Sequence, residues 1–413
     1  MKEIARTIYV QRLIDRRENG LIKIITGLRR AGKSYLLFKL YYDYLIGSGV
    51  ADDHIIRIAL DDEQNKSLLD TTLLRSYIEQ HMTDSLMYYL FLDEIQLVGR
   101  FEGLLNGLSR KHNLDIYVTG SNSRFLSADI LTEFRGRGDE IQVHPLSFAE
   151  YLSVFEGNEE DAWREYYTYG GLPLILSRGN DELKIHYLKT LLQKVYISDI
   201  VERHNLRGSE VMGSLLNVLA SGVGSLTNPH RLAKSFASNG MPNVSEKTIS
   251  TYIDHLTDAF LITRSERYDV KGKRYIASPC KYYFEDVGLR NARLNFRQQE
   301  ECHIMENIIY NELRMRGFAV DVGVVDIWEQ QVRKRTEIDF VCNLGSRRYY
   351  IQSAFAISDG EKMRQESRPL VSVTDSFKKI IVVKDPIKLW RTEEGVVVMG
   401  LRQFLLDANS LDL

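Results

Sequence analysis

Residues 27–34 are Gly-Leu-Arg-Arg-Ala-Gly-Lys-Ser, so the second of two spaced glycines is followed directly by a lysine and a serine. An apolar run at 21–26 precedes this segment and a helical pattern at 33–44 follows it. Glycines let the backbone curl until successive N–H groups face one anion, and a helix beginning there adds the positive end of its dipole. The pattern predicts a phosphate-binding loop between a strand and a helix, which requires an α/β fold.

Each position of this loop has an expected role. Lys33 is expected to reach the β- and γ-phosphates of a nucleotide, and Ser34 to hold Mg²⁺. A chance glycine-rich turn is the alternative, and the strand and helix on either side disfavour it. The expected nucleotide contacts are Gly27, Arg29, Arg30, Ala31, Gly32, Lys33, Ser34 and Tyr35.

Four further apolar runs follow the loop, at 54–60, 88–92, 115–119 and 140–143. Their apolar character is nearly continuous, and amphipathic stretches separate them. Strands of this kind are typical of a parallel sheet that helices cover on both faces.

The run at 88–92 ends directly in Asp93 and Glu94. Two carboxylates at the end of a buried strand are costly unless they meet a cation or water. Asp93 is expected to coordinate Mg²⁺ through water, and Glu94 to polarise the attacking water as a general base. Such a pair alone is usually a solvated turn, but together with the loop it predicts nucleotide hydrolysis.

Polar and basic residues after 115–119 supply further candidates. Asn122, and after it Ser121, is placed to orient the water or to contact the γ-phosphate, with an ordinary polar turn as the alternative. Arg137 is the first candidate for an arginine that stabilises transition-state charge, and Arg135 the second. Such an arginine acts either in cis or in trans, and action in trans requires a homo-oligomer.

Length and charge limit the remaining possibilities. A chain of 413 residues favours two or three domains. The net charge of -2 gives no global attraction to nucleic acid or to an anionic membrane. The start has no secretory signal, no apolar run approaches the roughly 20 residues of a membrane span, and three cysteines lack CxxC spacing. A cytoplasmic protein without a membrane partner is expected.

Taken together, the motifs resemble the prokaryotic AAA+-like ATPases of uncharacterised role. Those proteins carry a C-terminal domain of unknown function and are similar in organisation to archaeal ATPases. The likeness extends over the chain, and its motifs are specific for ATP binding but uninformative about biological role. It rests on the loop, Leu92–Gln96, Thr119–Ser123, Gly136–Arg137, Pro145–Phe148, Gly170–Pro173, Ser198–His204 and Glu306–Asn307.

This resemblance implies an AAA+-like core at 1–150 with a five-stranded parallel sheet, the strand before the phosphate loop being central. It further implies a helical lid at 151–205, a winged-helix-like segment at 206–280, and an α/β domain at 281–413 similar to restriction endonucleases. ATP and Mg²⁺ are the implied cofactors, because the guanine-specific Asn-Lys-x-Asp pattern does not follow the core.

The winged-helix-like segment makes DNA a candidate partner. Residues 246–256 are the candidate recognition helix, and 264–274 the candidate wing, with five basic residues against two acidic ones. Such a surface can contact phosphates. A solvated hairpin or a module that packs against protein is the alternative.

The C-terminal domain departs from the pattern of active nucleases. Nucleases of the implied fold need a helix Glu, a strand Asp and then Glu-x-Lys, which here correspond to Glu306, Asp339 and Gln352-Ser353-Ala354. Ala354 cannot replace a lysine, although Lys362 or Arg364 is a candidate to supply the charge. A degenerate domain that binds DNA or a partner is therefore expected.

Three functions stay open on these residues. The first is an ATP-driven switch or remodeller that acts on nucleic acid or on a protein complex, which the complete loop and acid pair favour. The second is an ATP-regulated, metal-dependent DNA nuclease, which the missing lysine disfavours. The third is a regulator of the defence or toxin–antitoxin type, which the sequence does not separate from the first.

Overall fold

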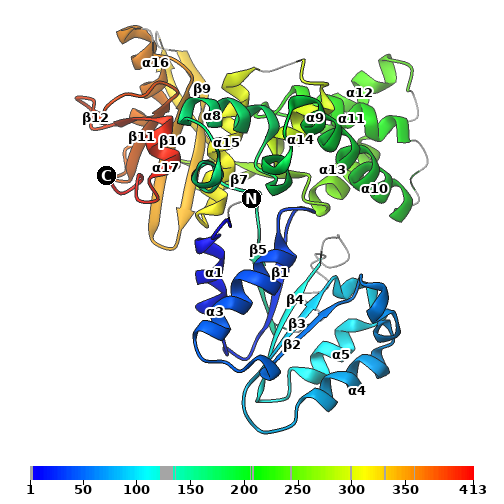
Figure 1. The fold of residues 1–413 in the computed structure, drawn as a ribbon. Coiled ribbons are helices and arrows are strands. Elements are labelled where there is room, and N and C mark those ends of the chain that lie inside the picture. Colours follow the sequence, from blue (N-terminus) through cyan, green and yellow to red (C-terminus); the bar gives the residue numbers. More distant parts are fainter. Residues whose placement is uncertain are drawn as a thin grey trace. The chain divides into compact units, whose positions relative to one another are not determined.

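A computed structural model of the chain describes residues 3–120, 134, 136–204, 206, 209–241, 244–297, 300–329, 332–357 and 359–413. They form two compact units, one of residues 1–145 with 258–260 and one of 146–257 with 261–413. Figure 1 draws both units as ribbons.

The first unit is built on a five-stranded sheet in the order β2-β3-β4-β1-β5, and every pairing in it is parallel. This confirms the predicted parallel sheet. The strand before the phosphate loop, β1, is an inner strand, but β4 occupies the middle because β5 adds only one strand beyond β1. The expected central place of that strand is therefore wrong by one position. The strands are β1 (Ile22–Thr26), β2 (Ile55–Ala59), β3 (Tyr88–Asp93), β4 (Leu114–Thr119) and β5 (Gly138–Gln142).

Helices cover both faces of this sheet, as its apolar strands require (Figure 1). On one face, α4 and α5 bury Leu74, Leu104 and their neighbours in the core with β1 to β4. On the other face, Tyr41 packs against Phe91 and Tyr117. The helical segments are α1 (Thr7–Ile14), α2 (Lys33–Tyr35), η1 (Leu36–Tyr41), α3 (Tyr42–Gly47), η2 (Asp52–His54), η3 (Glu63–Leu69), α4 (Thr71–His81), η4 (Ile95–Leu97) and α5 (Phe101–Leu108).

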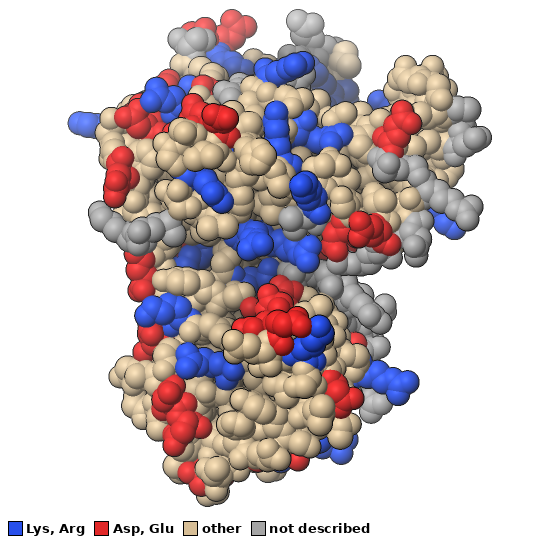
Figure 2. Space-filling view, turned by 45° about the vertical axis from the view of Figure 1, so that its right-hand side comes forward, with Lys and Arg blue, Asp and Glu red and all other residues tan. Residues whose placement is uncertain are grey.

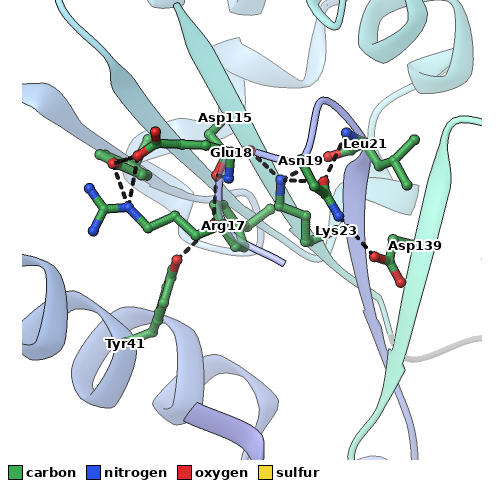
Figure 3. Close-up of polar contacts among 10 residues, drawn as sticks. Arg17, Glu18, Asn19, Leu21, Lys23, Tyr41, Asp115 and Asp139 are labelled. Carbon is green, nitrogen blue, oxygen red and sulfur yellow. Dashed lines mark hydrogen bonds and ion pairs between the residues drawn. The ribbon is translucent and has the colours of Figure 1, made fainter. Parts of the chain in front are cut away.

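A buried ion pair lies where β1 and β4 begin, at the opposite end of these strands from the phosphate loop (Figure 3). The Lys23 ammonium donates to Asp115 Oδ1 and to the Leu21 carbonyl oxygen. The Glu18 backbone N–H and the Tyr117 hydroxyl donate to the other Asp115 oxygen. A buried charge is costly unless it is paired and hydrogen-bonded. This network therefore fixes the chain between α1 and β1 against the sheet.

The second unit begins with a helical region, as predicted. Its Gly170-Gly171 segment is held by Asp286, whose carboxylate accepts hydrogen bonds from the backbone N–H groups of Gly171 and Leu289. Burial raises the pKa of Asp286 to about 6. The helices are α7 (Phe148–Val154), α8 (Glu159–Tyr169), η6 (Pro173–Ser177), α9 (Asp181–Thr190), η7 (Leu191–Ile197), α10 (Ser198–Arg203), α11 (Ser209–Ser221), α12 (Pro229–Ser238), α13 (Glu246–Asp258) and α14 (Val287–Arg293).

A mixed eight-stranded sheet completes the second unit, in the order β12-β13-β11-β10-β9-β8-β6-β7. On one face, α16 (Gly360–Val371) adds Leu370 to a core with Ile338 and Val341, and on the other, α15 (Glu301–Met315) places Tyr310 against Phe340. The short α17 (Leu401–Leu406) follows the last strand. The strands are β6 (Ile262–Asp269), β7 (Arg274–Phe284), β8 (Ala319–Glu329), β9 (Val332–Leu344), β10 (Arg347–Ala354), β11 (Lys378–Val383), β12 (Trp390–Arg391) and β13 (Val397–Gly400).

The candidate wing forms an antiparallel hairpin of β6 and β7, and α12 and α13 precede it. This hairpin also belongs to the eight-stranded sheet, because β6 pairs in parallel with β8. Residue 280, the predicted limit between the third and fourth domains, lies inside β7. The four domain ranges stay a prediction.

Basic and acidic side chains are interspersed on the face drawn in Figure 2. Among the residues that the structure describes, no helix is both long enough and apolar enough to cross a membrane.

Candidate functional site: a phosphate loop beside two carboxylates

The predicted phosphate loop curls between β1 and α2 through three residues with positive φ. Gly27 has φ 127°, Arg30 66° and Gly32 96°. A side chain on Gly27 would overlap the Val143 carbonyl oxygen, so this position requires glycine for space as well as for its backbone conformation. Leu36 N–H bonds back to the Gly32 carbonyl oxygen at 2.9 Å, which begins the helical run at 33–47.

The ammonium of Lys33 lies inside this loop. It donates to the carbonyl oxygens of Gly27 at 2.9 Å and Leu28 at 3.1 Å, and the residue is only 5% exposed. Burial lowers the pKa of Lys33 to about 8, although the charges of Glu94 and Asp93 act to raise it. The Lys33 ammonium therefore lies within the loop, where the charges of Glu94 and Asp93 act on it.

Asp93, at the end of β3, is the buried member of the acid pair. The Thr119 hydroxyl donates to Asp93 Oδ1, and the Ser34 hydroxyl bonds to the same carboxylate. Burial raises the pKa of Asp93, and these two hydrogen bonds act to lower it. The two side chains predicted to hold Mg²⁺ are therefore in contact.

Glu94 follows in a left-handed backbone conformation with φ 53°. Its backbone N–H donates to Thr119 Oγ1 at 3.2 Å, and the Gln96 amide donates to its carboxylate. For a residue other than glycine this backbone conformation is uncommon, and residues held in this way are often found at functional sites. Gln96 and Thr119 fix the direction in which Glu94 points.

Thr119 was missed as a site residue, although it ends the strand from which the sensor candidates were chosen. The register places Thr119 opposite Ile25 of β1, while its hydroxyl reaches Asp93 on β3. Asp61 was missed as well, and its charge acts to raise the pKa of Asp93. The signal available for Thr119 was a polar residue at the end of an apolar strand, the third strand after the loop in sequence.

The remaining predicted site residues lie beyond the loop and the acid pair in the sequence. Asn122, Ser121 and Arg135 lie outside the described residues. Arg137 is exposed, and its carbonyl oxygen accepts a hydrogen bond from Ile22 N–H at 2.8 Å. This contact puts the Arg137 backbone at the start of β1, about 16 Å along that strand from the phosphate loop.

Within the loop, the other predicted nucleotide contacts differ in exposure. Ala31 is buried and Arg29 is half-buried. Arg30 and Tyr35 are exposed, and the Tyr35 hydroxyl donates to Glu3 Oε2 at 3.3 Å.

The N–H donors and oxygen ligands at this site fit a nucleoside triphosphate with Mg²⁺. The first N–H groups of a helix have no acceptor within the helix, so those of Lys33 and Ser34 can serve an anion. A hydroxyl and a carboxylate in contact supply the hard oxygen ligands that Mg²⁺ prefers.

Comparisons with known proteins agree with this geometry. The family model described as "AAA domain" matches residues 19–152, which carry the loop and the acid pair. A second model, "Domain of unknown function (DUF8612)", matches residues 160–300. The chain thus combines an AAA domain of the P-loop class with a C-terminal domain of unknown function.

Two relatives extend the comparison over the length of the chain. An uncharacterised protein of Haemophilus influenzae is 33% identical over 385 residues, which are 92% of this chain and 93% of that protein. The uncharacterised protein MJ1544 of Methanocaldococcus jannaschii is 30% identical over 364 residues, 83% of this chain and 77% of that protein. The chain belongs to the family of these bacterial and archaeal AAA-domain proteins.

Solved structures are similar only at a low level. The Aeropyrum pernix Orc1 protein in complex with DNA aligns at 12% identity and TM-score 0.32, over 71% of this chain and 93% of that one. AMPPCP-bound DnaA from Aquifex aeolicus aligns at 14% identity and TM-score 0.32, over 62% of this chain and 89% of that one. Scores of this size carry no conclusion about function.

Proposed function

We infer that the AAA domain binds ATP with Mg²⁺ and hydrolyses the bond between its β- and γ-phosphates. The observation that carries this proposal is the meeting of Lys33, Ser34, Asp93 and Thr119 at the carboxyl ends of β1, β3 and β4. In an open sheet of parallel strands, a ligand usually binds at the carboxyl ends of the strands.

The residues of this site have distinct tasks in the proposed reaction. Lys33 exchanges its two carbonyl partners for phosphate oxygens, while Ser34 and Asp93 hold the metal. The bound metal supplies charge neutralisation of the phosphates. Glu94, oriented by Gln96, accepts a proton from the attacking water.

Arg137 is proposed to act in trans. Its backbone lies at the start of β1, at the opposite end of this strand from the phosphate loop of the same chain. This position favours contact with the nucleotide of a neighbouring copy. Asn122 keeps its proposed role in orienting the water. Together these assignments make a homo-oligomer the proposed active form.

Substitution of Glu94 by Gln tests the hydrolysis step. Glu94→Gln is expected to bind ATP as the natural chain does but to hydrolyse it at least about 100-fold more slowly, because the amide cannot accept the proton. Steady-state phosphate release with a parallel binding titration measures both effects. Glu63→Gln, an exposed carboxylate in the same domain, is the control and should hydrolyse normally. A normal rate in Glu94→Gln would remove Glu94 from this role.

The proposed role of this ATPase is that of a switch or remodeller with DNA as its partner. The turn between β6 and β7 supports DNA contact, because Lys271, Lys273 and Arg274 are exposed there. Stimulation of ATP hydrolysis by added duplex DNA is the expected result. A rate that DNA does not change would favour a protein partner instead.

A further inference from the structure

A cavity of about 360 Å³ lies in the helical region of the second unit. Its walls come from α9, η7 and α11 and from the C-terminal end of α14, which packs against all three (Figure 1). Sites for small organic molecules typically have volumes of about 300–1,000 Å³. The cavity is therefore large enough for such a ligand. The polar residues on its walls are Lys189, Gln193, Asn217, Arg293 and Asn295.

The charges on these walls have one sign. Lys189 and Arg293 are cations, and no Asp or Glu is among the described residues that line the cavity. Neither cation forms an ion pair with any residue in the described part of the chain. Burial lowers the pKa of Arg293. Because a partly buried charge is costly without a counter-charge, the lining favours an anionic ligand.

The guanidinium of Arg293 is held in a fixed direction by α11. Its Nε donates to Asn217 Oδ1 at 2.7 Å, and its Nη2 donates to the Gly213 carbonyl oxygen at 2.7 Å. A guanidinium has five N–H groups, and these bonds use two of them. Nη1 makes no hydrogen bond to another described residue, so its N–H groups are available to a ligand.

A glycine inside α11 makes room for this guanidinium. A Cβ atom at residue 213 would lie 3.3 Å from Arg293 Nη2, which is a tight contact. Glycine in the interior of a helix is less favourable than alanine, so Gly213 needs a reason for its place. The close approach of Arg293 supplies that reason.

Arg293 in turn orients the amide of Asn217. A guanidinium only donates hydrogen bonds, so the amide oxygen faces it and the NH₂ group points away. Asn217 lines the cavity, and its NH₂ group has no hydrogen-bond partner among the described residues. Together with Lys189, three helices thus bring N–H donors to one cavity.

The backbone after α14 has an uncommon conformation beside the cavity. Asn295 has φ 53° and Phe296 has φ 57°. Two successive left-handed residues other than glycine are rare, and such residues are often found at ligand-binding sites. Phe296 is anchored, because its N–H bonds to the Asn291 carbonyl oxygen at 2.8 Å and its ring packs against Tyr169. This anchor holds Asn295 at the cavity wall.

We propose that this cavity binds the phosphate group of a small phosphorylated organic molecule. A phosphate monoester carries about −1.5 to −2 charges at pH 7, which the two cations match, whereas a carboxylate would neutralise only one of them. The fork of a guanidinium also fits two phosphate oxygens at once. Leu192 and Ala292, both buried, give the organic part an apolar surface. A free phosphate ion would fill only a small part of the volume.

Titration calorimetry with AMP, a phosphate monoester, tests this site in the full chain carrying Lys33→Ala. That substitution removes the ammonium of the phosphate loop, so the result does not depend on the proposed nucleotide site. AMP should bind, and inorganic phosphate should bind more weakly. Failure of both to bind would overturn the proposal. Inorganic phosphate bound as tightly as AMP would contradict an organic ligand.

Substitutions in the cavity identify the side chains that hold the phosphate. Lys189→Ala and Arg293→Gln, each made in the Lys33→Ala chain, should weaken AMP binding about 10-fold or more, because each removes a charged hydrogen-bond donor. Lys234→Ala, an exposed lysine of α12 that does not line the cavity, is the control and should bind normally.

Melting curves without AMP separate lost binding from lost folding. Arg293→Gln removes two bonds to α11 and should melt at a lower temperature. Lys189 is exposed and bonds to no described side chain, so Lys189→Ala should melt normally and decides the question if Arg293→Gln does not fold. Unchanged AMP affinity in Lys189→Ala would rule the site out.

Discussion

At the scale of single residues, Thr119 joins Asp93 and Glu94 of the proposed nucleotide site. Its hydroxyl donates to Asp93 and accepts from the Glu94 backbone, and the residue is fully buried. A buried group whose partner is removed keeps the full cost of its lost hydration, about 1–3 kcal/mol. The hydroxyl therefore serves both the stability of the AAA domain and the direction of its carboxylates.

Replacement of Thr119 by Val tests this link, because it removes the hydroxyl at nearly constant volume. Thr119→Val is expected to lower the free energy of unfolding by about 1–3 kcal/mol and to slow ATP hydrolysis. Denaturant unfolding and phosphate release measure the two effects. Thr119→Ser keeps the hydroxyl and should hydrolyse ATP at close to the natural rate; equal loss in both variants would point to packing alone.

At the scale of elements, the exposed charges favour the hairpin of β6 and β7 over the candidate recognition helix as the proposed DNA contact. The exposed side chains of α13 include Glu246, Asp254 and Asp258 against Lys247. An excess of negative charge opposes an approach to phosphates. The turn of the hairpin has the opposite balance, with three exposed basic residues at 271–274.

Charge reversal in the hairpin turn tests this preference. Lys271→Glu combined with Lys273→Glu should weaken DNA binding and reduce the slope of log K against log salt by about 2, the loss of two phosphate contacts. Fluorescence anisotropy with a labelled duplex over a range of salt measures the slope. Lys247→Glu on α13 is the control, and a larger effect there would return the contact to the helix.

The same elements show what a sequence can predict. Apolar runs that end in a glycine loop or in Asp93-Glu94 marked β1 and β3 closely, because local pattern and burial coincide there. The pairing of β6 with β8 was not predictable, since it joins segments that no local pattern connects. The contacts of Lys281 in β7 with Glu306 and Asp339 were not predictable for the same reason, because these acids are 25 and 58 residues away in the sequence.

At the scale of the whole molecule, the chain has two compact units, each with its own sheet. The five-stranded parallel sheet carries the proposed nucleotide site, and the mixed eight-stranded sheet belongs to the second unit. The proposed nucleotide site is the premise of the function proposed for this chain, so its direct measurement comes first.

Titration of the full chain with a non-hydrolysable ATP analogue and Mg²⁺ is that measurement. The natural chain should bind the analogue, and Lys33→Ala should lose most of this affinity, since it removes the ammonium that lies inside the loop. Lys39→Ala, an exposed lysine on the same helical run that pairs with Asp43, should bind normally. Equal affinity in the natural chain and in Lys33→Ala would contradict the nucleotide site.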